Sequence, residues 1–470
     1  MALHGGSSRP DGPRQQPGGD ANPFVGEANP AFGLRVSPPR DRLADGPVPP
    51  EVAYQLIHDE LLLDGSARLN LATFVTTWME PQARELMAEC VDKNMIDKDE
   101  YPQTAELERR CVALLADLWH APDPARAVGC STTGSSEAAM LAGMALKRRW
   151  AAGRPGRREG GARPNLVMGA NVQVCWEKFC RYWDVEPRLV PVAGDRLCLD
   201  APEAVERCDE DTIGVVAVLG STFDGRYEPV ERIAGALDAL AAGGGPDVPL
   251  HVDAASGGMV APFLDPDLVW DFRLPRVVSI NTSGHKYGLV YPGVGWALWR
   301  DVTALPEDLV FEVDYLGGRM PTFALNFSRP GAQVVAQYYT FFRLGREGYR
   351  LVQQACRDVA TGLADGVAAM PEYRLVSRGR ELPVVTFTTT DDVTGFDVHA
   401  VSHALRARGW QVPAYPFPPD RQDLSVLRVV CRNGFSHDLA GLFLDDLRSA
   451  TSALAAAGPR HGPHAQGFHH

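Results

Sequence analysis

HVDAA at residues 251–255 and SGHK at residues 283–286 decide the fold, because each comes at or just after the end of a short apolar run. Such runs predict buried strands. An open α/β sheet presents its reactive groups at the carboxyl ends of its strands, so Asp253 and Lys286 are expected at one edge of one sheet. Taken singly, Asp253 could be a cap or turn residue and Lys286 a solvated side chain. As a pair they predict a site in an α/β fold.

A lysine and an acid at these positions suit one cofactor in particular. Pyridoxal phosphate is held by a lysine as a Schiff base, and it needs an acidic group facing its ring nitrogen. The acid keeps the ring protonated, so that the ring accepts electrons from a bond breaking at the substrate Cα. By themselves, Asp253 and Lys286 therefore indicate some enzyme that uses pyridoxal phosphate.

A second segment, Thr133-Gly134-Ser135-Ser136, opens a predicted helix over residues 136–150. Free N–H groups and the helix dipole favour a phosphate there, and small side chains let it approach. A serine-rich helix start is also common in proteins that bind no ligand. Since Ser283 and His285 could reach the same phosphate, the two segments together predict a phosphate cup. The chain has neither of the glycine-rich fingerprints of nucleotide-binding proteins.

The wider pattern predicts an α/β protein with a large and a small domain. From about Leu71 to Phe342 short apolar runs alternate with amphipathic ones, and the runs do not alternate cleanly, which suits strands covered on both faces. A smaller α/β pattern follows Gly345. The expected divisions are an N-terminal segment at 1–62 with a disordered start and a helical arm at 51–63, a large domain at 63–343, a small domain at 344–457 and a tail at 458–470. Expected strands and helices include strands at 212–219, 248–254, 276–280, 293–299, 382–388 and 424–431, and helices at 396–408 and 437–456.

The composition of the chain indicates in which cellular environment the protein works. The net charge of −13 argues against nucleic acid or an acidic membrane surface as the main partner. The first 20 residues lack the apolar core of a secretory signal, and no apolar run approaches the roughly 20 residues that a membrane helix needs. The nine scattered cysteines form neither a disulfide framework nor a metal-binding pattern. We therefore expect a cytoplasmic protein with no metal site and no stable membrane anchor.

Several longer blocks resemble the glutamate decarboxylases, bacterial members of the group II pyridoxal-phosphate-dependent decarboxylases. The resemblance runs from about residue 35 to the C-terminus and is carried by NLATFVTTWMEPQARELM (70–87), KNMIDKDEYPQTAELERRCV (93–112), TTGSSEAAMLAGMALKRRW (132–150), VQVCWEKFCRYWDV (172–185), HVDAASGGMVAPF (251–263), SGHKYGLVYPGVGW (283–296) and FALNFSRPGAQVVAQYY (323–339). It implies the fold-type I architecture and the conversion of L-glutamate to 4-aminobutyrate and CO2, with one proton consumed.

The resemblance also implies roles for individual residues in holding the cofactor. Lys286 would form the Schiff base, Asp253 would pair with the ring nitrogen and Ala255 would lie against the ring. Gln173 would stack on the outer face, where aromatic amino-acid decarboxylases usually have a histidine. The phosphate would be held by Ser135, Ser136 and His285, with Ser283 and Thr222 adding hydrogen bonds and Ser328 reaching the phosphate of a neighbouring subunit.

For the substrate, the resemblance places Thr73, Phe74, Asn94 and Asp97 around the distal carboxylate. An aspartate beside a carboxylate fits a shared proton and acidic conditions, while the alternative for Asp97 is a helix-surface position beside Lys98. Arg428 would face the substrate α-carboxylate, and an arginine inside an apolar strand otherwise needs a buried anion.

The resemblance extends to assembly and regulation. It implies a homo-oligomer, a dimer at least and a hexamer by analogy with bacterial members, with the 51–63 arm and Ser328 serving the neighbouring subunit. QGFHH at 466–470 resembles a C-terminal plug in which His470, or else His469, closes the site as pH rises, although a disordered His-rich tail explains it equally well. Calmodulin binding is not expected, because no basic amphipathic segment with a tryptophan follows the small domain.

Two rival functions remain at this point. A decarboxylase of another amino acid or an aminotransferase could use the same scaffold, but the polar set Thr73, Asn94 and Asp97 would not suit a bulky aromatic substrate. A catalytically silent protein acting as a binding scaffold is the rival from another class. The presence of Lys286, Asp253 and His285 together argues against it.

Overall fold

The computed structural model describes residues 37–153, 163–313 and 320–457. The chain divides into two compact units, up to Ser66 and from Ala67 onward. In the first unit, α2 (Pro50–Leu61) begins with a proline in its first turn and leaves Tyr54, Ile57 and Leu61 exposed. This confirms a helix within the expected arm. The predicted disordered start and the C-terminal tail with His469 and His470 lie outside the described residues.

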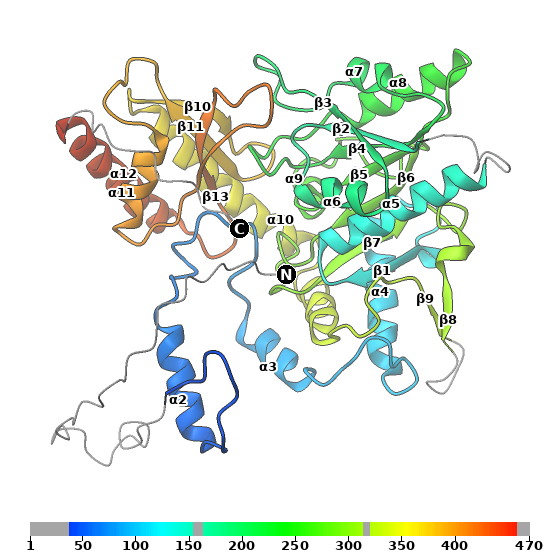
Figure 1. The fold of residues 1–470 in the computed structure, drawn as a ribbon, viewed down its shortest axis with the longest axis horizontal. Coiled ribbons are helices and arrows are strands. Elements are labelled where there is room, and N and C mark those ends of the chain that lie inside the picture. The colour runs from blue at the N-terminus through cyan, green and yellow to red at the C-terminus, as the bar shows by residue number, and fades with distance from the viewer. Residues whose placement is uncertain (1–36, 154–162, 314–319, 458–470) are drawn as a thin grey trace, which may run out of the picture. The chain divides into compact units, whose positions relative to one another are not determined.

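The second unit is built on a seven-stranded sheet (Figure 1). The strand order is β1-β7-β6-β5-β4-β2-β3, in which β7 runs antiparallel to β1 and β6 and the remaining neighbours are parallel. This confirms the predicted mainly parallel sheet. The strands are β1 (Val128–Thr132), β2 (Asn165–Gly169), β3 (Glu186–Val190), β4 (Thr212–Val218), β5 (Leu250–Asp253), β6 (Val277–Thr282) and β7 (Gly295–Trp299).

Both faces of this sheet are covered, which explains its continuous apolar strands. Along β4, Val215 packs into the core cluster that holds α4, α8 and α10, while Val216 packs into the cluster that holds α5 and α6. Neither side chain is exposed, so no polar face is needed. The helices of this layer are α3 (Pro81–Glu89), α4 (Pro102–Leu118), α5 (Ser135–Ala152), α6 (Val174–Tyr182), α7 (Ala201–Glu206), α8 (Val230–Ala242) and α9 (Ala261–Leu264), with 3-10 turns at Pro124–Arg126, Gly257–Met259 and Glu307–Leu309.

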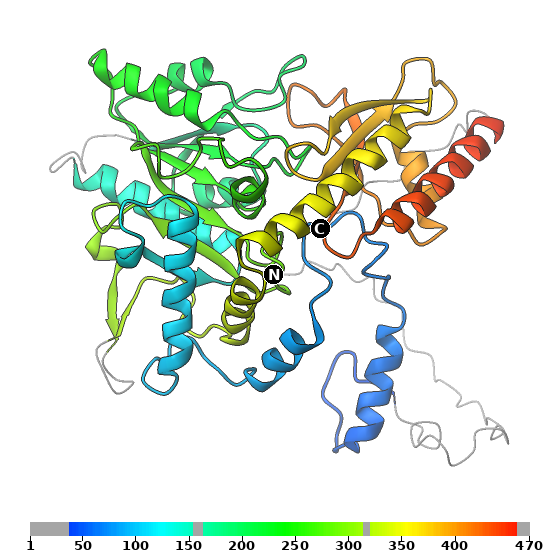
Figure 2. The same cartoon turned by 180° about the vertical axis from the view of Figure 1, so that it is seen from behind.

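The long helix α10 (Ala332–Ala368) runs from the large sheet to a second, smaller one (Figure 2). Gly345 interrupts it with φ 57°, next to the domain division predicted at residues 343 and 344. The second sheet is antiparallel throughout, in the order β10-β11-β13-β12. It comprises β10 (Tyr373–Arg378), β11 (Val384–Thr389), β12 (Ala414–Pro416) and β13 (Ser425–Val430), packed with α11 (Val398–Arg406) and α12 (His437–Ala457). Separately, β8 (Phe311–Val313) pairs antiparallel with β9 (Met320–Thr322).

Prolines account for two differences between the predicted and observed strand ends. The strand expected from residue 248 begins at Leu250, after Pro249, and the strand expected from residue 382 begins at Val384, after Pro383. A proline has no N–H with which to join a sheet, so regular pairing starts at the next residue.

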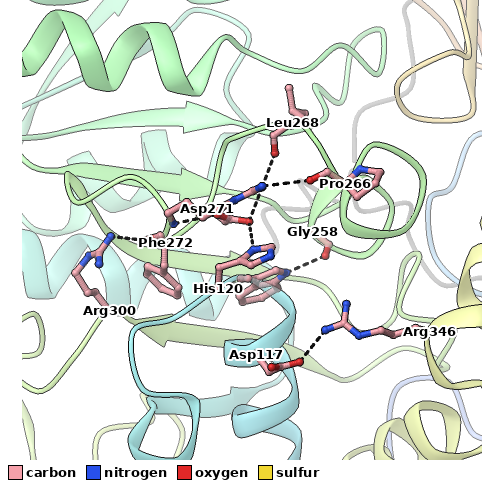
Figure 3. A network of polar contacts seen from close by, with 11 residues as sticks. Asp117, His120, Gly258, Pro266, Leu268, Asp271, Phe272, Arg300 and Arg346 are labelled. Atoms are coloured by element: carbon pink, nitrogen blue, oxygen red, sulfur yellow. Dashed lines mark hydrogen bonds and ion pairs between the residues drawn. The ribbon is translucent and has the colours of Figure 1, made fainter.

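A polar network fixes the end of α4 to the segment that follows β5 (Figure 3). The Trp119 indole donates to the carbonyl of Gly258 at 3.0 Å, and His120 Nδ1 lies 2.9 Å from a carboxylate oxygen of Asp271. Asp271 is buried and also accepts from the Arg273 guanidinium. The chain just beyond Asp253 is therefore held in place from outside the site. Within the described ranges, no helix has the length and apolar character to cross a membrane.

Candidate active site

Asp253 ends β5 with its carboxylate almost fully buried. One carboxylate oxygen accepts from Trp176 Nε1 at 2.8 Å, and the other accepts from Asn281 Nδ2 at 3.0 Å and from the Ala255 N–H at 3.1 Å. Three donors therefore fix the orientation of the Asp253 carboxylate at the strand end, as its proposed role at a ring nitrogen needs.

Lys286 lies in the loop between β6 and β7, on the same cavity as Asp253. Its Nζ donates to Ser256 Oγ at 3.3 Å and sits 5.4 Å from the centre of the Phe74 ring. Burial lowers the pKa of Lys286 below its ordinary value, and the charge of Asp253 opposes that shift. A lowered pKa increases the fraction of neutral amine, the form that attacks a carbonyl carbon.

Four of the residues predicted to hold the phosphate gather at the N-terminus of α5. Ser135 Oγ and Ser283 Oγ lie 2.6 Å apart, and Ser136 and His285 line the same cavity. Gly134 is required here, because a Cβ at this position would lie 2.9 Å from His285 Cε1. The helix start, three hydroxyls and an imidazole thus border one cavity, as the sequence predicted.

His285 is neutral in this setting. Burial and the neighbouring charge of Lys286 lower its pKa to about 4. Its Nδ1 is buried and has no hydrogen-bond partner among the described residues. An unpaired ring nitrogen in a buried site costs free energy unless a ligand satisfies it.

The walls of this cavity carry further predicted residues. Its volume is about 270 Å³. Gln173, Thr222 and Ala255 line it, and Gln173 also caps α6 by accepting from the Cys175 N–H at 2.6 Å. All ten predicted cofactor residues except Ser328 therefore border one cavity.

Arg428 reaches this region from β13 of the small sheet. It is 9% exposed and donates to the carbonyls of Thr222 at 2.5 Å and Ala72 at 2.7 Å, with its guanidinium carbon 4.9 Å from the centre of the Phe74 ring. Its Nε has no hydrogen-bond partner, and no carboxylate pairs with it, among the residues that the structure describes. The described residues thus do not supply the buried anion that the sequence led us to expect beside Arg428. Thr73, beside Phe74, accepts from the Val75 N–H at 3.0 Å.

Asn94, Asp97 and Ser328 lie elsewhere. They do not line the cavity around Lys286. Asn94 Nδ2 instead donates to Ser328 Oγ at 3.3 Å, and Asn94 Oδ1 accepts from the Arg329 N–H at 3.1 Å. Asp97 is part-buried in a turn and not on a helix surface. The structure brings these residues together, but apart from the cofactor residues of the same chain.

Sequence reasoning missed several residues that build the site. Trp176 holds Asp253, and Thr76 donates to the Lys286 carbonyl at 2.6 Å. Asn171 and Glu137 line the cavity. A tryptophan or threonine in an apolar setting reads as core, so only the contact reveals the role; for Glu137, its place in the first turn of the predicted helix was a usable signal.

Comparison with known proteins bears on this arrangement. Residues 48–390 match the family described as the pyridoxal-dependent decarboxylase conserved domain. The chain belongs to the pyridoxal-dependent decarboxylases. A glutamate decarboxylase of Aliivibrio fischeri is 53% identical over 442 residues, 93% of this chain and 95% of the relative. Glutamate decarboxylase 5 of Arabidopsis thaliana is 51% identical over 87% of this chain and 83% of its own length.

Solved structures agree with this assignment. A glutamate decarboxylase of Lactobacillus brevis superposes with a TM-score of 0.87 at 45% identity, covering 91% of this chain and 98% of that one. The resemblance seen in the sequence, the fold-type I architecture and the cofactor pyridoxal phosphate are thereby confirmed for this decarboxylase. The cavity fits that cofactor, because it offers an oriented carboxyl group, an amine of lowered pKa and an unpaired buried imidazole nitrogen.

Proposed function

We propose that this decarboxylase converts L-glutamate to 4-aminobutyrate and CO2. The observation that carries the proposal is 53% identity, over nearly the whole chain, to a protein named glutamate decarboxylase. The geometry is consistent with it, since Lys286 and Asp253 share one cavity with the phosphate cup.

The residues of the cavity divide the work of cofactor and substrate binding. Lys286 would hold the cofactor through its amine. Asp253 would keep a proton on the cofactor's ring nitrogen, and Ser135, Ser136, Ser283 and His285 would hold its phosphate. Gln173, Ala255 and Thr222, which line the same cavity, would contact the rest of the cofactor. When bound, pyridoxal phosphate supplies the electron sink for the pair released as the Cα–carboxylate bond breaks.

Substrate orientation falls to the groups around Lys286. Arg428, buried without an anionic partner in the described chain, binds the substrate α-carboxylate. The Phe74 ring lies next to both Arg428 and Lys286 and excludes water there. A carboxylate that leaves as neutral CO2 gains from such an apolar setting. The proton consumed in each turnover goes to Cα.

The distal carboxylate of glutamate is proposed to meet Thr73 and Phe74 of one subunit and Asn94 and Asp97 of its neighbour. The support is that the Phe74 ring lies 5.4 Å from Lys286 Nζ, whereas Asn94 and Asp97 do not border the cavity of their own chain. We likewise propose a homodimer at least, assembled to a hexamer, in which Ser328 reaches the neighbouring phosphate. We also propose that the protein is cytoplasmic and does not bind calmodulin, and that His470 closes the site as pH rises.

The decisive test is CO2 release from a panel of amino acids between acid and neutral pH. We expect release from glutamate and little from aromatic or basic amino acids. Replacing Lys286 by Ala should abolish release and the cofactor absorbance that depends on the lysine, with normal folding shown by circular dichroism. Release from another amino acid in preference to glutamate would refute the substrate, and full turnover by K286A would refute the site.

A shared site between subunits can be tested with mixed oligomers. K286A and N94A chains, each inactive alone, are coexpressed with different tags and the mixed species isolated. One of its two sites then has both Lys286 and Asn94, so activity should return above that of either parent. If the mixed species is as inactive as the parents, Asn94 does not act across subunits.

A further inference from the structure

A buried carboxylate that the proposed mechanism does not use lies behind the cofactor cavity. Glu228 is 2% exposed and accepts three hydrogen bonds, from the Val218 N–H at 2.7 Å, the Leu199 N–H at 3.0 Å and Asn171 Nδ2 at 3.0 Å. No lysine or arginine pairs with it in the part of the chain that the structure describes. A buried carboxylate without a cation depends on such donors for its charge.

These donors belong to the wall of the cavity. Asn171 and Val218 both line it, and Val218 is the direct register partner of Asp253 between β4 and β5. Glu228 also donates its own N–H to the Val218 carbonyl at 3.0 Å. The carboxylate therefore fixes the end of the strand that lies beside Asp253.

Asn171, the side-chain partner of Glu228, provides a second observation that points to a ligand. It is 1% exposed, and its Oδ1 has no hydrogen-bond partner among the described residues. Gly169, at the end of β2, makes room for the pair, because a Cβ there would lie 2.3 Å from Asn171 Oδ1 and 3.1 Å from Glu228 Oε1. The amide is thus held by Glu228 at the edge of the cavity.

We propose that Glu228 is a positioning residue for the cofactor, which in its ionised form holds Asn171 and the end of β4 in the geometry that binds pyridoxal phosphate. The inference rests on the cofactor site described above and adds to it a second carboxylate behind Asp253. Protonation of Glu228 weakens its hold on Asn171 and Val218, and so weakens cofactor binding.

The surroundings of Glu228 set where it titrates. Burial raises the pKa of Glu228 to about 7, helped by the negative charge of Asp253 and opposed by its three hydrogen-bond donors. Of the other groups near it, the Cys198 thiol stays neutral, since burial and Glu228 itself raise its pKa to about 12. Asp200 on the same segment caps α7 by accepting from the Ala201 N–H.

The test is a titration of full-length apoenzyme with pyridoxal phosphate, without substrate, from about pH 5.5 to 8.5. We expect the dissociation constant of the wild type to rise about tenfold as pH falls through about 7. E228Q should bind weakly at all pH values and lack this transition. The exposed neighbour substitution E231Q should behave as wild type. If E228Q binds as tightly as wild type and keeps the transition, the proposal is overturned.

Infrared difference spectra of the apoenzyme provide a readout of Glu228 itself that does not depend on the folding of E228Q. The apoenzyme should show a buried, protonated carboxyl band that grows as pH falls through about 7, and added cofactor should move that midpoint to lower pH. N171L keeps the branched shape of the side chain but removes one donor to the anion, so it should move the midpoint to higher pH. An unchanged midpoint in N171L contradicts the assignment to Glu228. Neither result bears on which amino acid is decarboxylated.

Discussion

At the scale of single residues, the site depends on buried polar groups whose partners come from distant parts of the chain. Asp253 is oriented by Trp176 from α6 and Asn281 from β6, and the guanidinium of Arg428 is oriented by two carbonyls. The sequence predicted Asp253 and Arg428, because a charged residue in an apolar strand is conspicuous. It could not predict Trp176, whose indole resembles any core side chain until the fold brings it to a carboxylate.

Replacing Trp176 by Phe tests this orientation. The substitution removes a hydrogen bond to a charged group, worth about 1.5–3 kcal/mol, so we expect cofactor affinity to fall roughly ten- to a hundredfold. Equilibrium titration of the apoenzyme measures the change. W183F is the matched control, since Trp183 stacks on Phe179 near the end of the same helix without contacting Asp253. Equal losses in both variants would assign the effect to packing.

At the scale of elements, the start of α5 and the loops that follow β5 and β6 make the cofactor cup. These elements were predictable, because strand periodicity and the Gly-Ser-Ser helix start are local signals. The boundary predicted at Gly345 coincides with a break in α10, because the φ of 57° at that residue interrupts the helical backbone. What the sequence did not predict is that helical segments lie directly on both sides of Gly345 and pack into the cores of the large and the small domain.

Substitution of Gly134 by Ala tests the helix start. The added methyl would lie 2.9 Å from His285 Cε1, so His285 must move and cofactor affinity should drop about tenfold or more. G153A, at the other end of α5, is the control, because a Cβ there meets only ordinary contacts at 3.7 Å. Fluorescence titration with pyridoxal phosphate compares the two. A G134A enzyme that binds as tightly as G153A would show that the cup tolerates the methyl.

At the scale of the whole molecule, buried acids make stability depend on pH. Burial raises the pKa of Glu228 to about 7 from its usual 4.5. A carboxyl with a raised pKa in the folded state contributes stability that is complete below its unfolded pKa and is lost as pH rises through its folded pKa. The wild type should therefore lose stability relative to E228Q between about pH 5 and pH 8, by roughly 1–3 kcal/mol.

Urea unfolding of the apoenzymes at several pH values measures this difference. E231Q, which changes an exposed carboxyl in the first turn of α8, should track the wild type throughout. A gap between wild type and E228Q that stays constant with pH would mean that Glu228 keeps one protonation state over this range.

The placement of Asn94 and Ser328 across subunits, as proposed above, cannot be predicted from sequence periodicity or from a single chain. The surface that these residues would meet is supplied by another copy of the chain.

Arg428 has a consequence for how the protein is made. The ribosome synthesises the chain from its N-terminus, and domains fold in that order during synthesis. The first strand of the large sheet, β1, cannot pair until its partner β7 has been synthesised. The contacts of Arg428 with Thr222 and Ala72 form later still, after β13 has been synthesised. A nascent chain thus acquires Asp253 and Lys286 well before the arginine that completes their surroundings. A cofactor that binds during translation would meet a cavity that still lacks Arg428. We therefore expect stable cofactor binding only after the whole chain has been synthesised.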